Sequence, residues 1–151
     1  MPAPRDSCVF CRIIEGREPS VKVYEDSSVV AFMDIYPINP GHLLVVPKRH
    51  VERFDELSEE EVAALAKAAR RLAPAVVKAV GADGYNIVSN NGRAAGQVIF
   101  HVHLHIVPRF SGDHCRFNCR RLGSSWQELE RVASLIRESL AQRWAWGAGT
   151  R

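Results

Sequence analysis

The segment His101-Val-His-Leu-His105 constrains this chain more than any other, because histidine alternates there with apolar residues. Alternate residues of a β-strand share one face, so the pattern predicts a strand with three histidines on one side and core residues on the other. We expect this strand to run from Val98 to Val107 and to end at Pro108. A strand that only faced solvent would mix Thr, Lys, Glu and Ser. The three histidines therefore indicate a functional face.

Two kinds of chemistry use histidines at this spacing. Three histidines can hold a catalytic zinc ion, but the first and third residues of such a strand lie roughly 13 Å apart, which makes a shared metal difficult to reach. A neutral imidazole is also a nucleophile toward phosphorus, and its ordinary pKa of about 6.5 leaves it largely neutral at pH 7. The segment Asn90-Asn-Gly-Arg-Ala-Ala-Gly-Gln97 precedes the histidines and offers backbone N–H groups and side-chain amides. These neighbours favour phosphate chemistry over the metal alternative.

Four further segments predict strands, because short apolar or β-branched runs are bounded there by Asp, Pro, Gly or Asn. They are Val21–Tyr24, Ser28–Asp34, His42–Val46 and Tyr85–Ser89. The first two are joined by so short a turn that they must pair antiparallel. With the histidine strand they make a five-stranded antiparallel sheet.

Two capping boxes predict two helices, one starting at Ser58-Glu-Glu-Glu61 and one at Ser125-Trp-Gln-Glu128. The first should reach about Val80, with Pro74 kinking or splitting it. The second should fray into a tail from Trp144 onwards. Five antiparallel strands with two helices make an α+β domain.

Composition and charge exclude two classes of partner. The 151 residues include 20 Lys+Arg and 17 Asp+Glu, and a net charge of +3 is too small to predict specific binding to nucleic acid. The longest purely apolar run, Val29-Val-Ala-Phe-Met33, falls far short of the ~20 residues that a membrane-spanning helix needs. No apolar segment follows Met1 to form a signal peptide, so we expect a cytoplasmic protein.

The histidine segment resembles the His-x-His-x-His-x-x signature of the histidine triad (HIT) superfamily of nucleotide hydrolases and transferases. Phe32-Met-Asp-Ile-Tyr-Pro37 and His42-Leu-Leu-Val-Val-Pro-Lys-Arg-His50 are similar to the nucleoside-binding half of that family. Gly84-Tyr-Asn-Ile87 and the segment 90–97 resemble its phosphate loop. The resemblance extends from about Cys8 to Gly112 and is closest to the bacterial, Hint-like branch.

This resemblance implies a role for each matching position. His103 would be the nucleophile that takes up the nucleoside monophosphate, and His105 would contact the phosphate or the leaving group. Asp34 would accept hydrogen bonds from both ribose hydroxyls. The remaining nucleotide-binding positions would be Phe32 and Ile35 at the base, and Asn90, Gly96, Gln97 and Val98 at the phosphate. Val98 stands where many members carry Ser or Thr, so a hydroxyl donor is lost while the backbone N–H remains.

The pair Cys8-Val-Phe-Cys11 allows several interpretations from its spacing alone: a redox motif, half of a zinc site, or free thiols. Zinc would need two further ligands, for which His50 and His101 are candidates. Zinc-bearing members of the family combine a Cys-x-x-Cys pair with these two histidine positions. The resemblance therefore implies a closed, structural zinc site. A second pair, Cys115 and Cys119, could bind a metal, but buried or free thiols are the expectation there.

Taken together, these features predict a nucleotide hydrolase or nucleotidyl transferase that acts at the α-phosphate of a purine nucleotide, a phosphoramidate or a dinucleoside polyphosphate. The reaction would pass through a covalent nucleotidyl-histidine. The alternatives are a nucleotide-binding or interaction module with little turnover, and a zinc-dependent hydrolase. We expect residues 1–112 to form the catalytic domain and residues 113–151 to form a helical extension within the same compact domain. The resemblance also implies a homodimer in which two five-stranded sheets join.

Overall fold

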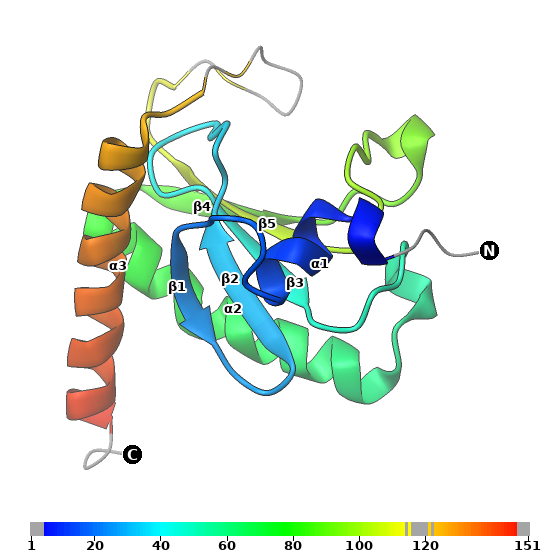
Figure 1. Ribbon diagram of the computed structural model, residues 1–151. Helices are drawn as coiled ribbons and strands as arrows, with labels where there is room; N and C mark the ends of the chain where they lie inside the picture. The colour runs from blue at the N-terminus through cyan, green and yellow to red at the C-terminus, as the bar shows by residue number, and fades with distance from the viewer. Residues whose placement is uncertain (1–4, 114, 116–120, 122, 148–151) are drawn as a thin grey trace.

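The computed structural model describes residues 5–113, 115, 121 and 123–147. Five strands form one antiparallel sheet in the order β1-β2-β3-β5-β4 (Figure 1). Their bounds are β1 Lys22–Glu25, β2 Val29–Met33, β3 Leu43–Pro47, β4 Gly84–Val88 and β5 Leu104–Arg109. The expected α+β fold with a five-stranded antiparallel sheet is confirmed.

Two long helices, α2 (Glu59–Val80) and α3 (Trp126–Gly147), pack on one face of the sheet (Figure 1). In β2 and β3, every second residue points to this face and is buried in the main core. These residues are Val29, Ala31, Met33, Leu43 and Val45. The residues that alternate with them in β2 and β3 therefore face the other side of the sheet.

The helix starts follow the sequence signals. Ser58 caps α2 in the predicted capping box, and the left-handed Gly81 ends it at φ 69°. Ser125 Oγ accepts the backbone N–H of Glu128 at the start of α3. The expected split at Pro74 is wrong, because α2 is continuous through it, with buried residues on both sides. The backbone of α3 is also helical past Trp144, as far as Gly147, while residues 148–151 lie outside the described residues.

A short helix that the sequence did not predict, α1 (Val9–Ile14), lies on the other face of the sheet (Figure 1). The 3-10 helix Arg5–Ser7 precedes it. Phe10 and Ile13 pack there on the second set of strand side chains: Val30, Phe32, Leu44 and Val46. Six residues are too few to show helical periodicity, and Cys8 supplies an unusual N-cap through its Sγ.

The expected strand from Val98 to Val107 is wrong at its start, because β5 begins only at Leu104. β4 ends at Val88, which pairs with His105, so no strand remains beside the preceding residues. The turn after β4 contains the 3-10 helix Arg93–Ala95 and carries the chain away from the sheet. Val102 donates its N–H instead to Val51 O at 2.8 Å, in the segment that follows β3.

A third 3-10 helix, Phe54–Glu56, lies between β3 and α2. Within the described part of the chain, no helix combines the length and the apolar character that crossing a bilayer requires.

Candidate active site and metal centre

The histidines gather on the α1 face of the sheet, where β3 and β5 pair. Leu44 of β3 stands opposite His105 in the register, and His42 immediately precedes β3. His103 immediately precedes β5, and its ring centroid lies 4.9 Å from that of His105. The ring centroids of His42 and His105 lie 5.1 Å apart. The pairing of β3 with β5 thus brings together three imidazoles from two distant parts of the sequence.

The backbone fixes the proton of His103. Its Nδ1 lies 2.7 Å from the carbonyl oxygen of His101, and a carbonyl can only accept, so Nδ1 carries the hydrogen. In the neutral ring this leaves a lone pair on Nε2. Burial lowers the pKa of His103, although its hydrogen bond to the His101 carbonyl works in the other direction. The ring therefore stays neutral at pH 7 with Nε2 available for nucleophilic attack.

His42 and His105 form a second hydrogen-bonded pair. The backbone N–H of Ile38 donates to His42 Nδ1 at 3.0 Å, so neutral His42 carries its proton on Nε2. That proton is donated to His105 Nδ1 at 2.9 Å, and neutral His105 must then carry its own proton on Nε2. Burial lowers the pKa of His42 to about 2 and that of His105 to about 3. His105 is therefore a neutral hydrogen-bond donor.

Sequence reasoning gave no role to His42, although it stands in a segment that carried the family resemblance. Its imidazole is completely buried. The sequence shows only a histidine directly before an apolar strand, and its complete burial becomes visible only in the structure.

Asp34 follows β2 and lies beside His42. Its Oδ1 accepts the backbone N–H of Tyr36 at 2.9 Å. Its Oδ2 accepts Nη1 of Arg121 at 3.2 Å and lies 3.4 Å from His42 Nε2. Burial raises the pKa of Asp34, while the Tyr36 N–H and Arg121 counteract the shift. The predicted ribose-binding carboxylate thus belongs to the histidine site.

The donor atoms of Asp34, His42 and His105 lie within 4.8 Å of one another, which is close enough to hold a metal ion. However, Arg121 already supplies a positive charge to the Asp34 carboxylate. The Ile38 N–H also fixes the His42 proton on Nε2, so that this nitrogen faces Asp34 and His105 as a donor and not as a metal ligand. The group is better described as a hydrogen-bonded network.

The two predicted base-pocket residues differ in their surroundings. Phe32 is buried and packs edge-on against Phe10, with ring centroids 5.3 Å apart. Ile35 is 48% exposed, directly after Asp34. Ile35 therefore has exposed apolar surface that could cover a base. Phe32 is buried in the core beneath the sheet surface and packs against Phe10.

The segment from Asn90 to Gln97 forms a turn held by its own side chains. The Oε1 of Gln97 accepts the Gly92 N–H at 2.8 Å, and its Nε2 donates to the carbonyls of Glu52 and Ile99. Gln97 thus uses its amide to shape the turn. Gly92 and Gly96 have φ of 90° and 93°, a conformation that suits glycine. Val98 follows, 78% exposed, so its side chain meets little of the protein.

The four predicted metal ligands converge at one point. The Sγ atoms of Cys8 and Cys11 and ring nitrogens of His50 and His101 all lie within 4.8 Å of one another. Cys8 Sγ lies 3.4 Å from His101 Nδ1, and Cys11 Sγ lies 3.4 Å from His50 Nδ1. Tetrahedral zinc with bonds of about 2.0 to 2.3 Å separates its ligand atoms by about 3.3 to 3.8 Å. The cluster therefore has the dimensions of a zinc site.

The protonation of His101 also suits a metal. Its Nε2 donates to the carbonyl of Pro47 at 2.8 Å, which leaves a lone pair on Nδ1 facing the cluster. His50 Nδ1 lies only 3.1 Å from this atom. Burial lowers the pKa of His101 to about 4 and raises the pKa of Cys11 to about 11. A cation among these donors would stabilise the thiolates and the facing nitrogens.

His103 is not part of this cluster among the described residues. His101 instead connects the two sites, because its ring faces the cluster while its carbonyl orients the His103 ring. The geometry therefore disfavours a hydrolase in which His101 and His103 hold a catalytic zinc together.

Of the second cysteine pair, the structure describes Cys115. Cys115 is disulfide-bonded, so the expectation of a free thiol is wrong for it. Cys119 and the neighbouring His114 lie outside the described residues.

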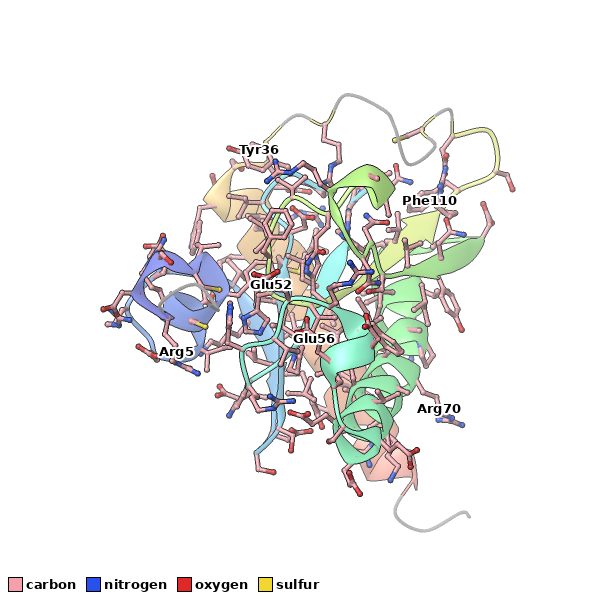
Figure 2. The ribbon with its side chains drawn as sticks, turned by 90° about the vertical axis from the view of Figure 1, so that its right-hand side faces the viewer. Arg5, Tyr36, Glu52, Glu56, Arg70 and Phe110 are labelled. Carbon is pink, nitrogen blue, oxygen red and sulfur yellow. The ribbon has the colours of Figure 1, made fainter. Side chains whose placement is uncertain are left out.

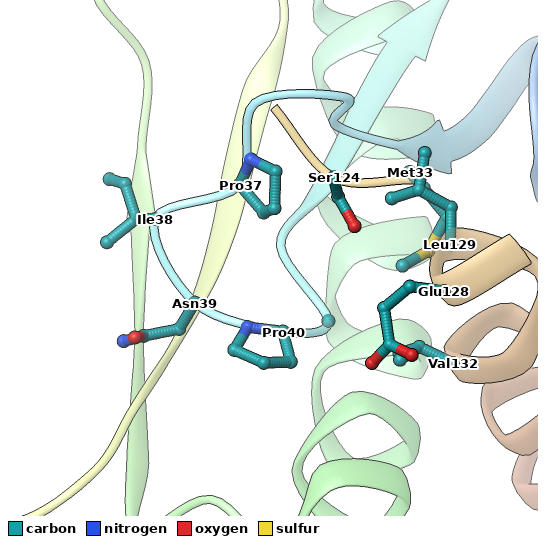
Figure 3. A pocket seen from close by; sticks show the side chains of 10 residues that line it. Met33, Pro37, Ile38, Asn39, Pro40, Ser124, Glu128, Leu129 and Val132 are labelled. Atoms are coloured by element: carbon teal, nitrogen blue, oxygen red, sulfur yellow. The ribbon is translucent and has the colours of Figure 1, made fainter. Parts of the chain in front are cut away.

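A small cavity of about 110 Å³ lies between the turn after Asp34 and the start of α3 (Figure 3). Its lining is mostly apolar: Met33, Pro37, Ile38, Asn39, Pro40, Gly41, Ser124, Glu128, Leu129 and Val132. It does not overlap with the predicted site residues.

Comparison with known proteins agrees with this arrangement. A sequence profile for the HIT domain matches residues 15–112. Adenylylsulfatase HINT3 of Arabidopsis thaliana is 41% identical over 132 residues, which cover 87% of this chain and 66% of the relative. Adenosine 5'-monophosphoramidase hnt1 of Schizosaccharomyces pombe is 44% identical over 103 residues, which cover 68% and 74% respectively.

A solved structure of a zinc-bound protein is also similar to this chain. The zinc-bound histidine triad family protein from Mycobacterium smegmatis matches with a TM-score of 0.84 and 39% identity, covering 94% of this chain and 99% of its own. The histidine signature, the sheet and the sequence relatives lead to one conclusion, that this chain belongs to the HIT family.

Proposed function

We propose that this protein hydrolyses or transfers purine nucleotides at the α-phosphate, through a covalent intermediate on His103. The observation that carries this proposal is the hydrogen bond from His103 Nδ1 to the His101 carbonyl. It holds a buried, neutral imidazole with the lone pair of Nε2 unused, which is what nucleophilic attack on phosphorus requires.

The reaction has two steps. His103 Nε2 attacks the α-phosphorus, a P–N bond forms, and the bond to the leaving group breaks with its electron pair on that group. Where the leaving group is an amine, its nitrogen takes a proton from solvent, and the Nε2–H of neutral His105 can donate a hydrogen bond to it. Water then attacks phosphorus, the P–N bond breaks, and the nucleoside monophosphate is released. Donors around the phosphoryl oxygens stabilise the charge that develops in both steps.

The remaining residues position the nucleotide. Asp34 accepts the ribose hydroxyls, and Ile35 covers the base above the buried Phe32. At the phosphate, Asn90, Gly96 and the backbone N–H of Val98 face the phosphoryl oxygens, while Gln97 maintains the shape of the turn. Residues 1–112 form the catalytic domain, and residues 113–151 extend it.

The cluster of Cys8, Cys11, His50 and His101 holds a structural zinc ion. Four protein donors close the coordination sphere, so the ion supplies folding free energy and not an activated water. By fixing His101, this centre also fixes the carbonyl that orients the nucleophile. The reduced thiols of Cys8 and Cys11 suit a cytoplasmic location, whereas the disulfide of Cys115 is uncommon in that compartment.

The exposed edge of the sheet suits a homodimer. β4 lies at that edge, and its Tyr85 and Ile87 are 47% and 46% exposed. Antiparallel pairing of β4 with a second copy would cover these side chains and join two sheets into one. Sedimentation as a monomer at micromolar concentration would contradict this arrangement.

Substitution of the nucleophile tests the proposed function. His103→Ala should lower the rate of adenosine phosphoramidate and diadenosine tetraphosphate hydrolysis on the order of 10⁴-fold or more. Adenosine monophosphate should still bind to the variant, because the ribose and phosphate contacts remain. The wild-type protein should give an acid-labile nucleotidyl adduct when quenched during turnover, and His103→Ala should give none.

Two results would contradict the proposal. The first is that His103→Ala retains most of the wild-type rate. The second is that the wild-type protein binds these nucleotides tightly without turning any of them over, which would instead support a binding module.

A further inference from the structure

An arginine from the C-terminal extension reaches into the histidine site. Arg121 lies between β5 and α3, and its Nη1 donates to Asp34 Oδ2 at 3.2 Å. The side chain of Asp34 is 9% exposed and that of Arg121 is 31% exposed, so solvent reaches the guanidinium while the carboxylate is buried. Arg121 therefore places a cation beside the carboxylate that the proposed nucleotide would contact.

The chain on the C-terminal side of Arg121 is docked against the residues that follow Asp34. Ser124 donates its N–H to the carbonyl of Ile35 at 3.0 Å. Gly123 lies so close to the Tyr36 ring that an added Cβ would meet a ring carbon at 3.4 Å. Figure 2 shows Tyr36 near the N-terminal end of α3. The position of Arg121 is thus supported by contacts other than its own ion pair.

The charge of Arg121 acts on the whole histidine site. It contributes to lowering the pKa values of His42 and His105, after the larger effect of burial. A guanidinium group also carries several N–H donors in a planar fork that matches the oxygens of sulfate and phosphate. Among the described residues, Arg121 donates through Nη1 to Asp34, and its guanidinium carries further N–H donors that could bind an anion.

We propose that Arg121 binds the oxyanion of the leaving group, and that it makes this enzyme select nucleotides whose leaving group is sulfate or a phosphate chain. This inference rests on the proposed function. Asp34 would turn to the ribose hydroxyls when a nucleotide binds, and the guanidinium would then span Asp34 and the anion.

The chemistry distinguishes the two kinds of leaving group. With adenylyl sulfate, His103 Nε2 forms the P–N bond, the bond from phosphorus to the bridging oxygen breaks, and that oxygen keeps the electron pair. Sulfate then leaves as a dianion that needs no proton, and Arg121 stabilises its negative charge. An amine leaving group instead takes a proton and carries no negative charge for Arg121 to bind.

The test compares kcat/KM for three substrates in wild type, Arg121→Gln and Arg121→Lys. Adenylyl sulfate and diadenosine tetraphosphate have anionic leaving groups, and adenosine phosphoramidate does not. In Arg121→Gln, the ratio of kcat/KM for either anionic substrate to that for the phosphoramidate should fall about 10- to 100-fold. Arg121→Lys keeps the charge but loses the planar arrangement of N–H donors. Its ratio of kcat/KM values should lie between those of wild type and Arg121→Gln. The control Arg131→Gln changes an exposed α3 arginine that pairs with Glu128, and its ratio should equal that of wild type.

Three outcomes would overturn the inference. Equal losses on all three substrates would mean that Arg121 only positions Asp34. Unchanged ratios would mean that it contacts no leaving group. A fall with only one of the two anionic substrates would limit Arg121 to sulfate or to polyphosphate and contradict a general oxyanion site. Wild-type turnover of none of the substrates would instead refute the proposed function itself, which separates the two failures.

Discussion

The backbone N–H of Ile38 donates to Nδ1 of His42, and this one bond sets the direction of the hydrogen bond from His42 to His105. His42 touches no substrate in this arrangement. It keeps the proton of His105 on Nε2, where it can donate a hydrogen bond to a leaving group. We therefore expect His42 to act as a positioning residue.

Two substitutions of His42 test that role. His42→Gln keeps a side-chain N–H donor, while His42→Phe keeps a ring and loses the donor. Hydrolysis of adenosine phosphoramidate, whose leaving group needs a proton, should fall about 10- to 100-fold in His42→Phe and much less in His42→Gln. Measurement of kcat against pH, with circular dichroism to confirm folding, checks the expectation. Equal losses in the two variants would indicate a purely structural role.

Removal of the zinc ligands should lower thermal stability more than it lowers the rate of turnover. Cys8→Ser with Cys11→Ser should abolish the single bound zinc per chain and lower the melting temperature, because a structural metal contributes folding free energy. Serine at position 8 can still cap α1, so the change isolates the loss of the metal from the loss of the cap.

The sheet and its two long helices should keep this variant folded, and His103 should keep measurable turnover. Zinc content per chain and activity, measured before and after treatment with a strong chelator, test this expectation. Complete and immediate loss of activity in a still-folded protein would point to a catalytic metal instead.

The buried neutral histidines should make the fold sensitive to acid. Folding lowers the pKa of His42 to about 2, whereas an unfolded chain has a histidine pKa of about 6.5. Below pH 6.5 the unfolded state therefore binds a proton that the native state does not, and the free energy of unfolding decreases as the pH falls. Above pH 6.5 the free energy of unfolding is not reduced by this effect. Below pH 6.5 each such histidine lowers the free energy of unfolding by up to about 1.4 kcal/mol per pH unit.

Urea unfolding at pH 7.5, 6.5 and 5.5 measures this slope. His42→Gln should have a shallower pH dependence than its parent between pH 6.5 and 5.5. The comparison is made in the Cys8→Ser, Cys11→Ser background, so that proton competition at the metal ligands does not contribute. Identical slopes with and without His42 would contradict the prediction.

Position 98 offers a substitution that should improve the enzyme. Val98 is 78% exposed, so Val98→Ser should change the free energy of unfolding by no more than about 0.5 kcal/mol. The new hydroxyl adds one donor beside the phosphate and should raise kcat/KM for adenosine phosphoramidate about 3- to 10-fold. Val98→Ala, which removes the same methyl groups without adding a donor, is the matched control. Equal rates in both variants would show that position 98 does not contact the phosphate.

The sequence predicted those parts of the fold whose signals are local. Alternation and capping residues gave the five strands and the start of α2 at Ser58, because side-chain periodicity and helix caps depend on neighbours along the chain. The start of β5 was wrong, because the end of a strand depends on whether a partner strand is present. Helix α1 was missed because its stability comes from packing Phe10 and Ile13 against the sheet.

The candidate site shows the same division. The residue types and the spacing of His101, His103 and His105 were sufficient to suggest their chemistry. Their protonation states were not available, because those depend on carbonyls and rings brought in from elsewhere in the fold. The Pro47 carbonyl that directs His101 is 54 residues away in the sequence. Nothing local in the sequence indicates that Arg121 reaches Asp34, which lies 87 residues earlier in the chain.

The order of the strands has a consequence for folding kinetics. β1, β2 and β3 form one antiparallel meander and β4 pairs with β5, but only the pairing from Leu43 to Val45 with β5 joins these two units. This pairing closes a loop that contains all of α2, and such non-local contacts form slowly compared with hairpins. His42 and His105, 63 residues apart, meet only at this junction. Recovery of activity after dilution from denaturant should therefore lag behind the return of helical circular dichroism, and would report when the two units of the sheet join.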